Sequence, residues 1–282
     1  MAGSLLILVF ALSCDASANI NDDLIQAVWH GREQTVRALL ATGLDLNVTD
    51  VYGSPILMIA VARGNKNIVE QLLSKGALVN VASTITGETP LITAAATGRA
   101  ELAKLLLSRG AEVNAVSANG ITALIAAATV EQDQTEIVNE LLNRGSRVNV
   151  ATREEGLTAL MAASGNGYTK MVQALLAKGA DVNARDRSGQ TALHHAIMAN
   201  KPEILELLLS KSADVNAKET KGRTPLMYSA ILGSKLEVMN LLLSRGADVR
   251  AKTPDGRTVL TIARKKNRAE IVQWLLKAGA TE

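Results

Sequence analysis

The chain has 282 residues, of which 48% are hydrophobic and only 2% are aromatic, and its formal net charge is +3. A core of Leu, Ala, Val and Ile with almost no ring side chains excludes a thick aromatic core and favours thin, regularly packed helices. The charge is too small to predict nucleic-acid binding by itself.

The first eighteen residues have the pattern of a secretory signal peptide. Residues 5–12 (LLILVFAL) form an unbroken apolar run, which is shorter than the ~20 residues that a membrane-spanning helix needs. The small-x-small step Ala16-Ser17-Ala18 follows and predicts Asn19 as the first mature residue. No Lys or Arg precedes the run, which departs from the usual signal pattern and would be explained by a start site placed too far downstream. A buried N-terminal helix stays open as the alternative. The signal predicts export, with the bacterial periplasm as the expected location.

The single cysteine, Cys14, allows a second form of export. A lipoprotein signal would be cleaved before Cys14 and anchor the chain there, and full secretion is a further alternative. The body after Cys14 has no cysteine, which excludes a disulfide framework, a thiolate nucleophile and a cysteine-based zinc site there.

Two sequence blocks repeat in phase over the rest of the chain. LLLSRGAEVNA at residues 105–115 recurs as LLNRGSRVNV, LLAKGADVNA, LLSKSADVNA and LLSRGADVRA. Its glycine returns every 33 to 35 residues, as from Gly43 to Gly76 and from Gly110 to Gly145, and Ser212 stands at one of these positions. The second block reads ETPLITA, ITALIAA, LTALMAA, QTALHHA and RTPLMYS, each after another glycine. A fixed period of this length indicates a stacked repeat architecture.

Each unit carries the start and stop signals of two helices. Thr122 and its equivalents are N-cap residues, and Pro90 follows such a threonine at the first helical position. The repeat glycine after the second helix can adopt the left-handed conformation that ends a helix. No unit can bury its apolar faces alone, so the units must stack.

In these blocks the chain resembles the ankyrin-repeat family, whose unit runs G-x-T-P-L-H-x-A-A and ends L-L-x-x-G-A-D-V-N-A. The resemblance covers residues 19–282. It implies an all-α solenoid of about eight stacked helix-turn-helix units with short hairpin loops. The expected division is a signal peptide at residues 1–18, an N-terminal capping repeat at 19–48, six internal repeats at 49–251 and a C-terminal capping repeat at 252–282.

Three departures from the repeat carry structural expectations. Pro55 stands where threonine is usual, so the second unit should lack its cap hydrogen bond. The fourth unit has extra residues near 129–136, which we place in the turn between its helices. Gly165 and Gly167 should loosen the centre slightly, since a helix glycine costs about 1 kcal/mol relative to Ala.

Reactive side chains are scarce, which argues against an enzyme. The mature chain has three histidines and neither a phosphate-binding glycine loop nor a nucleophile elbow. His194 and His195 are adjacent, but His194 aligns with the family's motif histidine, which the resemblance makes a structural residue. The two rings should point about 100° apart, whereas metal ligands prefer a spacing of three or four residues. We expect no catalytic residue, no cofactor and no metal.

The densest basic cluster, RKKNR at residues 264–268, has two interpretations. The favoured one is a solvated face of the last repeat. The alternative is a site for an acidic partner, phospholipid headgroups or nucleic acid. No aromatic side chain interleaves for base stacking, which disfavours single-stranded nucleic acid.

The resemblance further implies a protein-binding concave face formed by hairpin tips and inner helices. Mapping the family's variable positions predicts a groove that is apolar and partly acidic near the centre and basic toward the C-terminal end. The predicted contact residues are Val51, Tyr52, Arg63, Ile121, Val130, Glu154, Glu155, Leu157, His195, Met198, Lys221, Arg223, Ile231, Leu232, Arg257, Lys265 and Lys266. For Val130 and Leu232, packing between repeats is the alternative.

The expected function is therefore that of a non-enzymatic scaffold that binds a protein not identified by the sequence. Nucleic acid is disfavoured as a partner, no transmembrane span is expected, and we expect a monomer. Two alternatives stay open, a regulatory or stabilising subunit or inhibitor of a periplasmic enzyme, and a secreted effector that binds a host protein.

Overall fold

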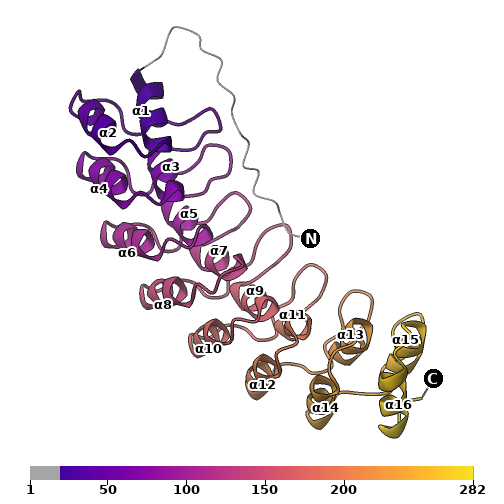
Figure 1. Cartoon of the computed structure of the whole chain (residues 1–282). Coiled ribbons are helices and arrows are strands. Elements are labelled where there is room, and N and C mark those ends of the chain that lie inside the picture. The colour runs from indigo at the N-terminus through magenta and orange to yellow at the C-terminus, as the bar shows by residue number, and fades with distance from the viewer. Residues whose placement is uncertain (1–19, 282) are drawn as a thin grey trace.

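The computed structural model describes residues 20–281, and over this range the chain consists of sixteen α-helices without a β-strand (Figure 1). In chain order they are α1 (Ile20–Trp29), α2 (Glu33–Leu40), α3 (Ile56–Arg63), α4 (Lys66–Ser74), α5 (Pro90–Ala96), α6 (Ala100–Ser108), α7 (Ala123–Thr129), α8 (Thr135–Asn143), α9 (Ala159–Asn166), α10 (Thr169–Ala177), α11 (Ala192–Ala199), α12 (Pro202–Ser210), α13 (Pro225–Leu232), α14 (Leu236–Ser244), α15 (Val259–Lys265) and α16 (Ala269–Lys277).

Consecutive helices form antiparallel pairs, and the pairs stack along one axis. Each odd-numbered helix packs against the even-numbered helix that follows it and against the next odd-numbered helix. Figure 1 shows the odd-numbered helices as an inner row and the even-numbered helices as an outer row, with the hairpin loops on the side away from the outer row. The predicted all-α solenoid of eight units is confirmed.

Threonine side chains start most of the inner helices, as their sequence positions predict. The Oγ1 atom of Thr122 accepts a hydrogen bond from the Ile125 backbone N–H at 3.2 Å, and five of the units share this contact. At α3 the N-cap is Pro55, and no side chain there makes a cap hydrogen bond. The expected loss in the second unit is therefore confirmed.

The repeat glycines take the left-handed conformation at the ends of the outer helices. Gly145 has φ +82° and Gly179 has φ +81°. Ser212 occupies the same position in the sixth unit with φ +62°, where a side chain is strained by its own Cβ. The stop signal therefore acts at this position even without glycine.

A ladder of asparagine side chains joins neighbouring hairpins. Asn149 Nδ2 donates to the Gly179 carbonyl at 3.1 Å, and its Oδ1 accepts from the Asp181 N–H at 2.8 Å. Both contacts recur at four other units. Each hairpin is thereby held in register with the next.

The core lies between the two rows of helices and along the inner row. Leu106, Leu141 and Leu175 are fully buried on the outer helices. Ala127 and Ala163 are fully buried on the inner row, where their small side chains let neighbouring helices approach closely.

The insertion in the fourth unit lies where the sequence predicts it, between α7 and α8 at residues 130–134. The next unit contacts this loop, because Tyr168 Oη donates to the Val130 carbonyl at 2.7 Å, and it also contacts the end of α7, because Asn166 Nδ2 donates to the Ala128 carbonyl at 3.0 Å. The extra residues are thus accommodated without breaking the stack.

Candidate functional site

We call the inner face the surface formed by the last turns of the odd-numbered helices and by the hairpin tips. Met198 on α11 is 52% exposed, and Leu232 at the end of α13 is 45% exposed. Ile231, beside Leu232, is half-buried and packs on the core. These three residues form an apolar strip on two neighbouring inner helices, exposed at Met198 and Leu232. We call it the apolar strip.

The hairpin tips change in character along the stack. Val51 and Tyr52 are exposed in the second unit, at a tip where Tyr52 donates its N–H to Asp50 Oδ1. Glu154 and Glu155 form an exposed acidic tip in the fifth unit. Lys221 supplies a positive charge at the tip of the seventh unit. One face therefore presents apolar, acidic and basic tips in turn.

Several predicted contact residues are less available than their sequence positions suggest. Ile121 and Leu157 are half-buried and pack against the core. Val130 caps α7 and is half-buried. Arg63 is exposed, but its guanidinium lies over the Trp29 ring at 5.1 Å from the centroid. Among the predicted apolar positions near the centre, the most exposed are thus Met198 and Leu232, in the sixth and seventh units.

His195 is committed to a contact within its own repeat. Its Nε2 lies 3.0 Å from Asp186 Oδ2, and only 15% of its side chain is exposed. The carboxylate comes from the hairpin that precedes α11, so the ring ties the hairpin to the helix. This leaves His195 little surface for a partner.

A polar network continues from this pair into the seventh unit. The Tyr228 hydroxyl accepts hydrogen bonds from Gln190 Nε2 at 2.9 Å and from Arg223 Nη2 at 3.0 Å. Arg223 also forms a 3.0 Å ion pair with Glu219, whose side chain is 2% exposed. Burial alone would raise the pKa of Glu219, but the hydrogen bonds from Arg223 outweigh it and hold the pKa below its usual value. Arg223 is therefore neutralised within the protein.

His194 is structural, as the motif position implies. Its side chain is fully buried, and Nδ1 accepts the Thr191 backbone N–H at 3.2 Å. The ring meets Tyr228 edge to face, with centroids 5.2 Å apart. Burial lowers the pKa of His194 from 6.5 to about 4, although the nearby Arg223 backbone opposes the shift. The imidazole is therefore neutral near pH 7.

Six of the predicted residues converge on a hollow of ≈ 780 Å³ between the seventh and eighth units. They are Lys221, Arg223, Ile231, Arg257, Lys265 and Lys266. Two hairpins and the helices α13 and α15 form its walls. We call this hollow the basic pocket. The predicted basic residues of the C-terminal end thus gather around one open hollow.

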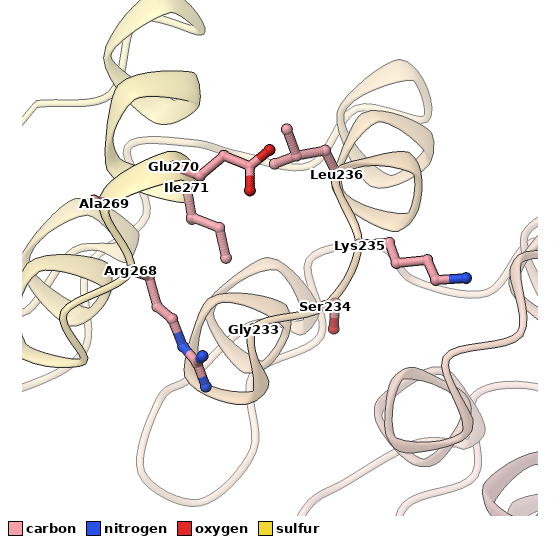
Figure 2. A pocket seen from close by; sticks show the side chains of 8 residues that line it. All are labelled: Gly233, Ser234, Lys235, Leu236, Arg268, Ala269, Glu270 and Ile271. Atoms are coloured by element: carbon pink, nitrogen blue, oxygen red, sulfur yellow. The ribbon is translucent and has the colours of Figure 1, made fainter.

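A second hollow, of ≈ 470 Å³, lies between the starts of α14 and α16 (Figure 2). Arg268 reaches over Gly233 in this view, and its Nη2 donates to the Leu232 carbonyl at 3.3 Å, while Lys235 extends away. The guanidinium of Arg99 approaches Gly64 in the same way in an earlier unit. The recurrence identifies this feature as part of the repeat scaffold.

Two further findings bear on chemistry over residues 20–281. No group of three or more His, Cys, Asp or Glu side chains there is arranged to hold a metal ion. None of the helices in this range combines the length and apolar character needed to cross a lipid bilayer. The predicted signal peptide and Cys14 lie outside the described residues.

Some residues of the face were not predicted. Pro254 and Ile262 line the basic pocket, and Tyr228 joins the polar network. Tyr228 did carry a signal, since the equivalent position holds Ile59, Ala126 and Ala162 in earlier units and a ring side chain only at His195 and Tyr228. Its partners come from two hairpins and are visible only in the fold.

The family model for ankyrin repeats matches residues 24–117, 57–152, 123–219 and 213–281. Among curated proteins, the chain is 34% identical over 174 residues to the nuclear factor NF-kappa-B p105 subunit of Gallus gallus, which covers 58% of this chain and 17% of that protein. It is 39% identical over 74 residues to the potassium channel AKT1 of Oryza sativa subsp. indica, covering 26% of this chain and 8% of that protein.

A match to an L-asparaginase of Dirofilaria immitis is 27% identical over 180 residues and covers 64% of this chain but only 24% of that enzyme. This partial match at low identity gives no ground for asparaginase activity here. The chain thus spans less than a quarter of the length of each of these three relatives. The family matches nevertheless extend from residue 24 to residue 281. The chain belongs to the ankyrin-repeat family, whose repeats form a protein–protein interaction domain and are generally not enzymes.

Proposed function

We propose that the protein binds a segment of a partner protein on its inner face. The observation that carries this proposal is the apolar strip. Met198 and Leu232 are large apolar side chains, each about half exposed, and their helices α11 and α13 are neighbours in the stack. Scattered apolar residues on a surface are normal, whereas a cluster indicates a contact surface.

The strip can supply a useful share of binding energy. Full burial of a Leu or Met side chain stabilises by about 1.5–3 kcal/mol. Because each side chain is already half covered, a partner would gain about 1 kcal/mol from each. The two contacts together contribute about 2 kcal/mol, so losing both should weaken the affinity by about thirtyfold.

The proposal is tested by replacing Met198 and Leu232 with Asp. Both side chains are exposed, so the helices should form as before, which circular dichroism can check. The matched control replaces Leu78 and Leu276, which are 59% and 45% exposed away from the strip, with Asp. Proteins captured from an extract of the source cells should be lost with the first variant and kept with the second. Equal capture by both variants would place the binding surface elsewhere.

We further propose that the protein acts as a monomer after export, in a bacterial periplasm. The support is the apolar run at residues 5–12 followed by Ala16-Ser17-Ala18. Mass spectrometry of the mature N-terminus in the periplasmic fraction should find Asn19 first. An intact N-terminus recovered from the cytoplasm would contradict export, and light scattering that gave a dimer mass would contradict the monomer.

A further inference from the structure

We propose that the basic pocket takes an acidic segment of the partner protein, with an apolar side chain of that segment seated on Ile231 and Ile262. This rests on the proposed function, since it adds the chemistry of the bound segment to binding on the inner face. The pocket adjoins the apolar strip through Ile231, which belongs to both.

The charges at the pocket do not cancel within the protein. Glu219 neutralises Arg223 at 3.0 Å, and Asp255 neutralises Arg257 at 2.8 Å. Lys221, Lys265 and Lys266 are exposed at the same pocket, and no carboxylate of the described residues pairs with any of them. Three like charges around one hollow repel each other, and an anionic group bound there would relieve that repulsion.

A purely structural role explains only part of this arrangement. Lys265 lies in the last turn of α15 and Lys266 is its C-cap residue. Positive charge at this end of a helix is stabilised by the negative end of the helix dipole. Lys221 lies on a hairpin and has no such role. Its convergence with the other two lysines therefore indicates a surface arranged for an anion.

The floor of the pocket is apolar. Ile231 is half-buried on α13 and Ile262 is 8% exposed on α15. A simple inorganic anion would leave these surfaces uncovered. A peptide with carboxylates on both sides of an apolar residue would cover the floor and meet the lysines at the same time.

The walls of the pocket are held in place before binding. Gly222 has φ +73°, and a Cβ added there would lie 2.4 Å from Pro254 Cδ. The hairpins of the seventh and eighth units therefore pack directly on each other. Lys218 Nζ also donates to the Lys252 carbonyl across them at 3.3 Å. A preformed pocket loses little ordering entropy when it binds a segment.

Phosphate groups fit this pocket less well than carboxylates. Phosphate sites commonly use a helix N-terminus, whose amides point at the anion, whereas the pocket has the C-terminal end of α15. Its arginines are engaged with Glu219 and Asp255. No Phe, Tyr or Trp lines it to stack on a base. An acidic peptide is therefore favoured over nucleic acid.

The test uses the full chain and short fluorescein-labelled probes, with binding followed by fluorescence anisotropy. The first probe is a peptide of repeated Glu-Glu-Leu triplets. A second has Ser in place of Leu, a third has Lys in place of Glu, and a fourth is an oligothymidylate of equal length. The pocket variant is Lys221→Gln/Lys265→Gln/Lys266→Gln. The matched control, Lys66→Gln/Lys75→Gln/Lys178→Gln, removes the same charge from exposed sites at the ends of outer helices.

The Glu-Glu-Leu peptide should bind with a dissociation constant below about 1 mM. The pocket variant should weaken it about tenfold, since exposed charge pairs contribute about 0.2–1 kcal/mol each, and the control should change it little. The Ser and Lys peptides should bind more weakly than the first. The inference is overturned by no binding, by equal weakening in the control, or by an oligothymidylate that binds as tightly as the peptide.

Failure of this inference can be told apart from failure of the proposed function. If the captured partner is lost with Met198→Asp/Leu232→Asp but kept with the pocket variant, the inner face binds protein without using the lysines. If the pocket variant loses the peptide while the Asp variant still captures the partner, the pocket binds acidic segments but the apolar strip is not the partner's site.

Discussion

Acidification should destabilise the protein through His194 at a pH where carboxylates are still ionised. The ring is fully buried and its pKa is lowered to about 4, against 6.5 for the ordinary group. Because the pKa of His194 is lower in the folded than in the unfolded protein, its contribution to the free energy of unfolding is fully present above about pH 6.5. This contribution is lost as the pH falls toward about 4. At 1.36 kcal/mol per pKa unit the full loss is about 3.4 kcal/mol, of which about 2 kcal/mol is reached at about pH 5.

The variant His194→Met isolates this effect, because Met58, Met161 and Met227 occupy the equivalent position in other units. Methionine loses the hydrogen bond with Thr191, so the variant should be about 1 kcal/mol less stable at neutral pH. It has no proton to bind, so its stability should cross that of the parent near about pH 6 and exceed it at about pH 5.

Thermal unfolding followed by circular dichroism measures this difference. The midpoint of the parent should fall relative to the variant by about 4–8 °C between about pH 7.5 and about pH 5, at about 2–4 °C for each kcal/mol. Repeat arrays can unfold in parts, so hydrogen exchange of the α11 amides provides a local measure. Parallel losses in the two proteins would refute the neutral, buried state of His194.

Three further changes test the repeat scaffold by the midpoint of thermal unfolding. Ser212→Gly should raise the midpoint by a few degrees, because it removes a strained left-handed side chain that costs about 1 kcal/mol; a lower midpoint would contradict this. Asn149→Ala should lower the free energy of unfolding by about 1–2 kcal/mol, because two hydrogen bonds to the next hairpin are lost, and an unchanged midpoint would mean that water replaces them. Gly120→Ala should destabilise more than Gly145→Ala, because its Cβ would lie 2.9 Å from the Arg153 backbone nitrogen whereas Gly145 has open space. Equal effects would contradict that contact.

The helix pairs could be predicted from the sequence because their signals are local. Thr122 caps α7 through an amide three residues on, and Gly145 ends α8 by its own φ. Since each unit repeats these signals in phase, assigning the helix boundaries of one unit predicts those of the other units. Even the insertion between α7 and α8 could be placed, because both flanking helices kept their own patterns.

The candidate site was less predictable because its contacts cross between segments. The partner of His195 is Asp186, nine residues earlier, and the two meet only once the hairpin folds back on α11. The burial of Leu157 depends in the same way on how its hairpin lies against the core. Six residues of the basic pocket were predicted singly as contact positions, but their convergence on one hollow depends on the packing of the seventh unit on the eighth.

The place of the candidate site follows from one position near the end of the inner helices. In the middle of the stack this position holds Ala96, Thr129 and Gly165, and the inner helices α5 to α11 pack closely there. Small side chains permit that close packing, but they offer a partner little surface.

Toward the C-terminal end the same position holds Met198, Ile231 and Lys265, and α13 lies less closely packed between its neighbours. The larger side chains project onto the inner face, and the wider spacing leaves room for the basic pocket. The same helical position thus has a different effect in the central units and in the C-terminal units. Small residues let the central units pack closely, and larger apolar and charged residues form the surface of the last three units that we propose for partner binding.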